Sequence, residues 1–257
     1  MVVSREVSYI QRAANVLRSL AEEPSSGGVS EIAKRLELSR SAVHRVLQEL
    51  VSTGLAAYEP RDRTYSLGPA AVELSLFVLD WLPIRHQARP LLYQLRDVTG
   101  ESAGLLLKMG NRYAAVDHVV SKRPSKFVPV MGRARALRYG AGGRAILAFQ
   151  SNEYLHSYLS RLREKPGTGQ LYDDPDWLQQ ELASVRATGY SVSAGESGPG
   201  MNTFACPLRG SDGTVSAAVS MNGPAEHWSV ERMLECAPEC FEVLQGIETR
   251  LRSSFPD

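Results

Sequence analysis

Hydrogen-bond donors recur at helical spacing in one stretch of this chain. Between Val29 and Gly54 the sequence reads as two short helices joined by a tight turn, and the second helix carries arginine, serine and histidine near its start. Arginine there can donate two hydrogen bonds to a guanine edge, and serine or histidine can reach phosphates or bases. This is the layout of a helix-turn-helix, whose second helix enters the DNA major groove. The candidate DNA contacts on it are Ser39, Arg40, Ser41, His44 and Arg45.

The opposite face of the second helix is apolar. At about 100° per residue the stripe consists of Val43, Val46, Leu47, Leu50 and Val51. We expect Ser30 and Ser39 to cap the two helices and Gly54 to follow the end of the second. Glu37 falls in the turn between them, where a positive φ would favour glycine. A polar face that is merely solvated on a small helical bundle is the alternative interpretation.

A hairpin and an apolar helix follow. Two β-like runs, residues 55–59 and 64–68, flank the charged turn 60–63, and a hairpin behind three helices forms a wing. On its turn, Arg61 and Arg63 are expected to touch the DNA backbone or the minor groove. Residues 70–82 then form a helix that is apolar over much of its circumference. Such a helix must pack on something, and a partner subunit is a reasonable candidate.

The remainder of the chain alternates between helices and strands. A helix over residues 84–100 must bend or start at Pro90. We further expect strands at 101–108, 111–120, around 127–131, 190–195, 201–210 and 213–223, and helices at 142–149, 153–162, 174–189 and from about Val230 to Arg252. A central antiparallel sheet with helices on it predicts an α+β sensor-type domain, not a doubly wound nucleotide fold.

Two features of this second half suit a small ligand. Residues 140–145 fit G-x-G-x-x-A, but no strand-helix-strand unit surrounds them, so a dinucleotide site is not expected. A glycine turn that leads into a helix still presents free N–H groups to an anion, which suits a carboxylate at Gly140 and Ala141. A packing turn without a ligand is the alternative. Ser220 and Asn222 point to the same side of one strand and could both contact one ligand.

Catalytic and metal-binding patterns are not found. The five histidines are scattered, and Cys236 and Cys240 lack the two further ligands of a zinc site, so half-buried thiols are expected. No P-loop, G-x-S-x-G elbow or carboxylate pair occurs, so we expect neither an enzyme nor a metal ion or cofactor. The three cysteines indicate reduced thiols in the cytoplasm, and the lack of a long apolar run argues against a membrane span. At a net charge of +1, any DNA attraction must come from locally placed arginines.

Three segments carry a resemblance to a known family. They are LSRSAVHRVLQEL (38–50), YEPRDRTYSLGP (58–69) and TGYSVSAGESGPGMNTFACPLRGSDGTVSAAVSMNGP (188–224). In this order, and over nearly the whole chain, they resemble the IclR-type family of bacterial transcriptional regulators. The resemblance implies a winged helix-turn-helix over residues 1–68, a linker helix over 69–83 and a GAF-like effector-binding and oligomerisation domain over 84–257. Family members act as dimers or tetramers on operator DNA and respond to small metabolites, often carboxylates or aromatics.

The resemblance also implies effector contacts. The glycine turn at Gly140 and Ala141 would line the effector pocket together with Thr203, Ser220 and Asn222. Thr203 stands where the family often has cysteine, and Asn222 replaces a common serine, so this pocket reads different groups from those of its relatives. Of an acidic pair common after Gly-Tyr, only Glu196 is present, and it joins the candidates.

Two hypotheses from different classes follow. The first is a transcriptional regulator that binds a pseudo-palindromic operator as a homodimer or homotetramer, with half-sites about one helical turn apart or a multiple of it. A small effector would shift the balance between two arrangements of the DNA-binding heads. The second is a metabolite-binding protein or enzyme whose N-terminal domain serves only for dimerisation. A DNA footprint separates the two hypotheses, because only the first predicts a protected palindrome.

Overall fold

The structure is a computed structural model that describes residues 8–22, 27–164, 170–196, 198–210 and 212–252. The chain divides into two compact units, Met1–Leu82 and Pro83–Asp257. The mixture of helices and antiparallel sheet agrees with the predicted α+β class. None of the described helices combines the length and the apolar character that a membrane crossing requires.

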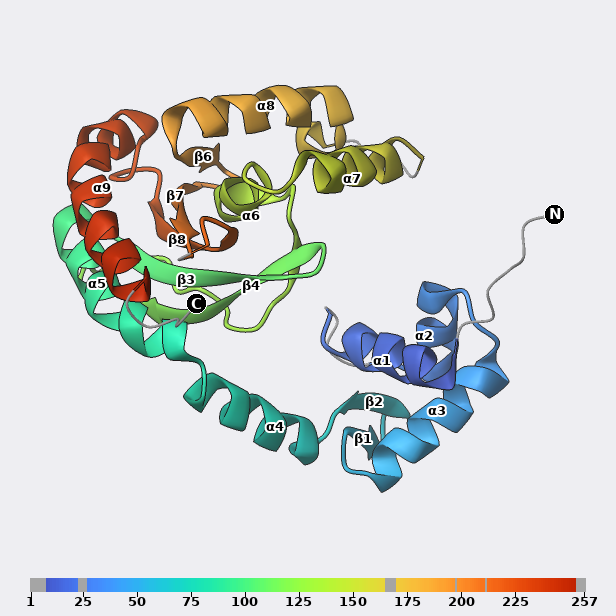
Figure 1. Ribbon diagram of the computed structural model, residues 1–257. Coiled ribbons are helices and arrows are strands. Elements are labelled where there is room, and N and C mark those ends of the chain that lie inside the picture. Colours follow the sequence, from blue (N-terminus) through green and yellow to red (C-terminus); the bar gives the residue numbers. More distant parts are fainter. Residues whose placement is uncertain (1–7, 23–26, 165–169, 197, 211, 253–257) are drawn as a thin grey trace. The chain divides into compact units, whose positions relative to one another are not determined.

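The first unit is a helical cluster with a hairpin. Its elements are α1 (Tyr9–Leu20), α2 (Val29–Leu36), α3 (Arg40–Ser52), β1 (Ala56–Glu59), β2 (Thr64–Leu67) and α4 (Pro69–Asp80) (Figure 1). The core draws one buried face from each of the first three helices, including Val16, Ile32 and Leu47, and Tyr65 from the hairpin. Burial of these apolar faces against one another holds the short helices, which would be marginal alone.

Helix caps in this unit agree only in part with the sequence. Ser39 caps α3 as predicted, with its hydroxyl accepting from the Ala42 N–H at 3.2 Å. The prediction for Ser30 is wrong, because α2 begins at Val29 and the carbonyl of Gly28 accepts the first helical hydrogen bonds. Glu37 adopts the predicted left-handed conformation, with φ 54°, and Gly54, at φ 72°, follows the end of α3 as expected.

The hairpin is tied to the helices through its second strand. β1 and β2 pair antiparallel, with Tyr58 opposite Tyr65. The backbone of Gly27 exchanges two hydrogen bonds with Tyr65, at 3.1 and 3.0 Å, and so extends the pair just before α2. The predicted wing is therefore present, and its turn projects Arg61 and Arg63 with both side chains exposed.

The second unit is built on one antiparallel sheet of six strands. The strand order is β5-β4-β3-β8-β7-β6. In chain order the elements are α5 (Pro83–Thr99), β3 (Ser102–Met109), β4 (Arg112–Val119), β5 (Arg135–Ala136), α6 (Gly140–Leu147), α7 (Asn152–Glu164), the short 3-10 helix Leu171–Asp173, α8 (Pro175–Thr188), β6 (Ser191–Ala194), β7 (Met201–Arg209), β8 (Val215–Pro224) and α9 (Val230–Arg252).

Helices cover both faces of this sheet (Figure 1). α5 and α9 pack together on one face, while α6 lies on the other, with α8 and α7 outside it. On the α6 side, alternate strand residues such as Leu106, Ala205 and Ala218 join Ala145 and Ile146 in one buried cluster. The N-terminal end of α6 lies against Leu106 of β3 and Tyr113 of β4 on this face.

α5 begins at Pro83 and runs through Pro90, so of the two predicted alternatives the helix does not start at the proline. Ala88, Leu91 and Leu95 are buried and stabilise the helix on both sides of Pro90. Two other local expectations differ from the structure. Residues 127–131 form no strand, because Pro129 lacks the N–H that a ladder needs. The edge of β4 that β3 leaves open is paired by the short β5 instead. α6 begins at Gly140 and ends at Leu147, two residues earlier at each end than the predicted 142–149.

Candidate functional site

The exposed face of α3 gathers the predicted DNA contacts. Ser39, Arg40, Ser41, His44 and Arg45 are all exposed, whereas Val43 between them points into the core. The Ser39 hydroxyl already accepts from Ala42 and lies 3.1 Å from that of Ser41, so its first task is to cap and orient the helix. Arg40, His44 and Arg45 are left with their donors directed outward, as a helix that reads a groove requires.

The second candidate site is a cavity of about 180 Å³ between the sheet and the start of α6. Five of the six predicted effector residues line it: Gly140, Ala141, Thr203, Ser220 and Asn222. The apolar wall is formed by residues that the sequence did not single out, among them Leu106, Tyr113 and Phe127. Arg133 and Arg135 also line the cavity and were likewise missed. Burial raises the pKa of Tyr113, so this part of the wall carries no charge near neutral pH.

Thr203, Ser220 and Asn222 form a hydrogen-bonded polar trio at one side of the cavity. Thr203 Oγ1 donates to Asn222 Oδ1, and Asn222 Nδ2 donates to Ser220 Oγ, both at 3.0 Å. The three side chains come together because Thr203 lies opposite Asn222 in the β7-β8 register, while Ser220 is two residues back on β8. Since Ser220 Oγ accepts from Asn222, its own proton remains to be donated to an acceptor on a ligand.

Glycine lets α6 approach the sheet closely. Gly140 has φ 68°, and a Cβ on Gly142 would lie 2.1 Å from Leu106 Cδ1. A Cβ on Gly143 would lie 2.4 Å from the Leu137 carbonyl oxygen. The glycine turn therefore serves the close packing of α6 on the sheet, which was the alternative interpretation, and it also lines the cavity.

Glu196 contacts the candidate Gly140 but does not line the cavity. Its carboxylate accepts from Arg144 Nη1 at 2.8 Å and Nη2 at 2.7 Å, and from the Gly140 N–H at 3.0 Å. Arg144 is only 1% exposed. The anion at the N-terminus of α6 is thus supplied by the chain itself. In the sequence, Arg144 stands in a run of small and apolar residues, a pattern that could have indicated a buried ion pair.

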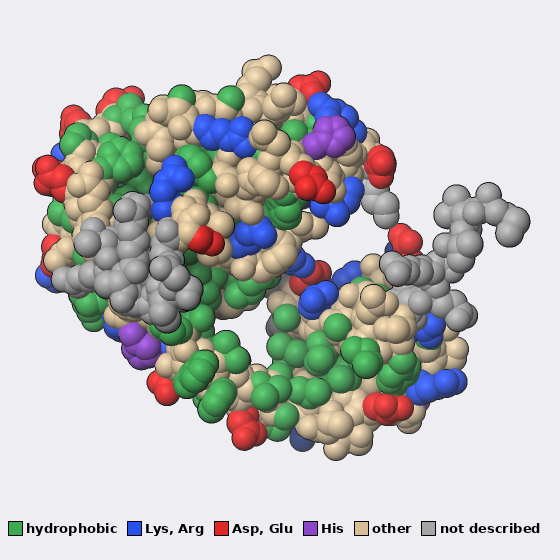
Figure 2. Space-filling model, viewed as in Figure 1, with side chains coloured by type: hydrophobic (Ala, Val, Ile, Leu, Met, Phe, Trp, Pro, Cys, Tyr) green, Lys and Arg blue, Asp and Glu red, His purple; other side chains and the backbone are tan. Residues whose placement is uncertain are grey.

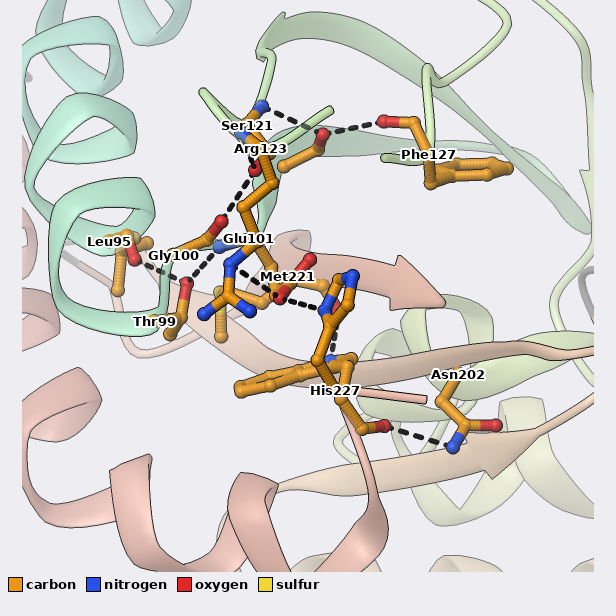
Figure 3. A network of polar contacts seen from close by, with 12 residues as sticks. Leu95, Thr99, Gly100, Glu101, Ser121, Arg123, Phe127, Asn202, Met221 and His227 are labelled. Atoms are coloured by element: carbon orange, nitrogen blue, oxygen red, sulfur yellow. Dashed lines mark hydrogen bonds and ion pairs between the residues drawn. The ribbon is translucent and has the colours of Figure 1, made fainter. Parts of the chain in front are cut away.

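A buried polar network fixes the segment that carries Phe127 (Figure 3). Ser102 Oγ donates to the Phe127 carbonyl at 2.5 Å and accepts from the Ser121 N–H at 3.0 Å. Next to it, the fully buried Glu101 lies 2.8 Å from His227 Nδ1 and 3.5 Å from Arg123 Nε. These contacts join the start of β3, the segment after β4 and the turn before α9, so the Phe127 side of the cavity is held in place.

Cysteines and metal-binding groups do not form a further site. Cys236 and Cys240 are buried rather than half-buried as expected, and Cys206 is buried too. Burial raises the pKa of each thiol. Within the described ranges, no group of three or more His, Cys, Asp and Glu side chains could hold a metal ion. The chemistry of this unit therefore centres on the cavity.

Family comparisons cover both units. Residues 10–60 match the IclR helix-turn-helix domain, and residues 76–245 match the domain described as bacterial transcriptional regulator IclR C-terminal. The HTH-type transcriptional regulator BhcR of Paracoccus denitrificans is 31% identical over 94% of this chain and 86% of its own length. The Pca regulon regulatory protein of Pseudomonas putida is 30% identical over 84% of this chain and 74% of its own length.

Solved structures agree. A putative IclR transcriptional regulator from Silicibacter sp. superposes with a TM-score of 0.81 at 23% identity, covering 97% of this chain and 98% of that one, which shows a common fold. An IclR homolog from Microbacterium hydrocarbonoxydans, complexed with 4-hydroxybenzoate, is 26% identical with a TM-score of 0.68 and covers 96% of this chain and 100% of that one.

Proposed function

Because the chain belongs to the IclR family of bacterial transcriptional regulators, we propose how its parts divide the task of regulation. Residues 1–68 bind operator DNA, residues 69–83 form the connecting helix and residues 84–257 bind the effector. The chain is a DNA-binding regulator and not an enzyme, in line with the regulators that it resembles. The alternative in which the N-terminal domain only dimerises is therefore set aside.

The observation that carries the DNA-binding assignment is the division of α3 into a buried and an exposed face. Arg40 and Arg45 are long, exposed donors within one turn and a half of the helix N-terminus, where a recognition helix meets base edges. Ser41 and His44 lie between them and can reach phosphates. Arg61 and Arg63 on the wing add cations that grip the backbone without reading sequence.

The apolar surface of α4 supports assembly into dimers. No residue of this helix is buried, and Leu76, Phe77 and Trp81 are 62%, 71% and 78% exposed. Figure 2 shows hydrophobic side chains gathered over this helix. An apolar patch of this kind is unfavourable in water and marks a contact surface. In this proposal a second copy of the chain covers it, and the two recognition helices then meet a pseudo-palindromic operator.

The cavity supports a small carboxylate or aromatic effector. Its polar trio offers a hydroxyl proton to an acceptor, and Leu106, Tyr113 and Phe127 offer apolar area to a ring. The 4-hydroxybenzoate held by the Microbacterium hydrocarbonoxydans homolog has this combination of groups. The effector changes operator affinity only through its differential affinity for two arrangements of the protein, typically worth about 1–3 kcal/mol.

Two variants test the division of labour. We expect Arg45→Ala to weaken operator binding by about 1–3 kcal/mol in a mobility-shift titration at fixed salt, with ligand binding unchanged. Asn222→Ala should retain operator binding and lose the thermal shift that 4-hydroxybenzoate produces. In the parent protein this ligand, at about 100 times its Kd, should add about 2.7 kcal/mol to the free energy of unfolding. Operator DNA is taken from upstream of the protein's own gene and located by footprinting. Unchanged operator affinity of the Arg45 variant, or no protected site at modest salt, would refute the DNA assignment.

A further inference from the structure

The effector cavity has a second polar side, formed by guanidinium groups. We propose that Arg135, with Arg133 beside it in the sequence, recognises a second anionic group, so that the effector is a dianion with an apolar middle, such as an aromatic dicarboxylate. The inference rests on the proposed function, because it concerns the same cavity. It differs from that function in what it requires of the ligand: two anionic ends instead of one.

The sheet separates the two polar sides. The polar trio lies on β7 and β8, whereas Arg135 lies on β5 at the far edge of the sheet. Two strands, β3 and β4, stand between β8 and β5. At about 4.8 Å per strand, the backbones of β8 and β5 are about 14 Å apart across the sheet. The two sides are also offset along the strands, because Arg135 pairs with Tyr113, which pairs with Lys108, four residues along β3 from the partner of Ser220. At about 3.4 Å per residue this offset is about 14 Å, so one carboxylate cannot satisfy both sides.

The middle of the cavity is apolar. Leu106 on β3 and Tyr113 on β4 occupy the strands between the two polar sides, and Phe127 faces the same space. The Tyr113 hydroxyl is used already, since it donates to the Tyr139 carbonyl at 3.0 Å. A ligand that spans the cavity therefore needs an apolar body where it crosses these strands, as a benzene ring or a methylene chain provides.

Charge balance favours a second anion at Arg135. Two other arginines near α6 have carboxylate partners within the chain: Arg138 with Asp173 at 2.6 Å and Arg144 with Glu196 at 2.7 Å. For Arg135, no ion pair with an Asp or Glu occurs in the described part of the chain, and its guanidinium lies over the Tyr139 ring at 4.6 Å. None of the residues that line the cavity is acidic. A half-buried arginine in such a wall binds a carboxylate by charge-assisted hydrogen bonds.

The test compares matched pairs of probes by isothermal titration calorimetry on the full-length protein. Benzene-1,4-dicarboxylate is paired with benzoate, and adipate with hexanoate, so that each pair differs by one carboxylate. The variants are Arg135→Gln and, as a control that removes one exposed positive charge elsewhere, Arg161→Gln on α7. In the parent protein and the control, we expect one of the dicarboxylates to bind about tenfold or more tightly than its partner. Arg135→Gln should abolish that difference and leave the monocarboxylate affinity within about twofold.

The outcomes distinguish failure of the dianion proposal from failure of the proposed effector-binding function. One result overturns the dianion proposal and leaves the effector cavity in place. In it, 4-hydroxybenzoate or a monocarboxylate binds, Asn222→Ala removes that binding, and Arg135→Gln changes no affinity. An equal loss of monocarboxylate and dicarboxylate affinity in Arg135→Gln also overturns it, because the arginine then acts on the cavity as a whole. If no probe binds, both the dianion and the proposed carboxylate effector are refuted. Unchanged melting of both arginine variants, checked beforehand, ensures that folded protein is compared.

Discussion

Glu196→Gln removes one charge from a buried ion pair and preserves the shape of the side chain. In the ion pair, Arg144, 1% exposed, donates from Nη2 to Oε1 at 2.7 Å and from Nη1 to Oε2 at 2.8 Å, and the Gly140 N–H donates to Oε2 at 3.0 Å. Glutamine offers one accepting oxygen where the carboxylate offered two. The new NH₂ group therefore faces either Arg144 Nη2, or both Arg144 Nη1 and the Gly140 N–H.

The magnitude follows from the burial of Arg144. Removing one partner of a buried ion pair costs about 3–5 kcal/mol, because the remaining charge stays out of water. Two features reduce the loss: the Val192 carbonyl still accepts from Arg144 at 3.0 Å, and the Glu196 side chain is 19% exposed, so water screens the site in part. We expect about 3 kcal/mol, which for a domain of this size lowers Tm by about 6–12 °C.

Differential scanning calorimetry on the full chain measures this loss of stability, because it records the thermal unfolding of the second unit together with that of the first. Glu181→Gln is the matched control, because Glu181 lies 3.5 Å from the same arginine and is 26% exposed. Its substitution should cost less than about 1 kcal/mol. A Glu196→Gln transition within about 2 °C of the parent would refute the reasoning, as would equal losses in both variants. Loss of effector affinity at full stability would instead restore Glu196 as the effector contact that the sequence predicted.

Three further predictions concern the turn, the thiols and α4. Glu37→Gly should stabilise the first unit by up to about 1 kcal/mol in urea unfolding, since Glu37 has φ 54°; a loss of stability would show that the glutamate side chain outweighs the strain. Burial raises the pKa of Cys240 to about 12, above the 9.0 of an ordinary thiol. The folded state therefore keeps a proton that the unfolded state releases, so stability is full below about pH 9 and falls towards pH 12. The alkaline slope of stability should be smaller in Cys240→Ala, and an equal slope would exclude this linkage. Phe77→Asp should convert a dimer into monomers in light scattering, whereas Glu73→Gln on the same helix should not; unchanged dimers would place the contact elsewhere.

Periodicity and turn chemistry predicted much of the first unit. The alternation of buried and exposed residues along α3, the cap at Ser39 and the positive φ of Glu37 all depend on neighbours within a few positions. Such local determinants can be read from one sequence. In the second unit the placing of Ser220 beside Asn222 is local in the same sense, because alternate residues of a strand share a face.

Long-range pairing could not be predicted in this way. Glu196 and Arg144 lie 52 positions apart, and only the packing of α6 on the sheet makes them partners. Arg135 reaches the cavity because β5 adds to the edge of β4, a pairing of two residues that no periodicity reveals. The segment around Phe127 looked like a strand by composition, yet it forms a wall of the cavity. The Phe127 carbonyl accepts from Ser102, and Arg123 before it pairs with Glu101, contacts that composition does not predict.

The close approach of α6 to the sheet limits how the effector cavity can change by mutation. A Cβ on Gly142 or Gly143 would overlap Leu106 or the Leu137 carbonyl, so the distance between the helix and the sheet is set by two missing side chains. Substitution there would lift the helix, enlarge the gap and separate Gly140 from Glu196. Substitutions of wall residues such as Thr203, Asn222 or Arg135 can therefore change which ligands bind, while the distance between α6 and the sheet stays constant. The same scaffold can in this way accept ligands of different polarity but similar thickness, with flat rings among them.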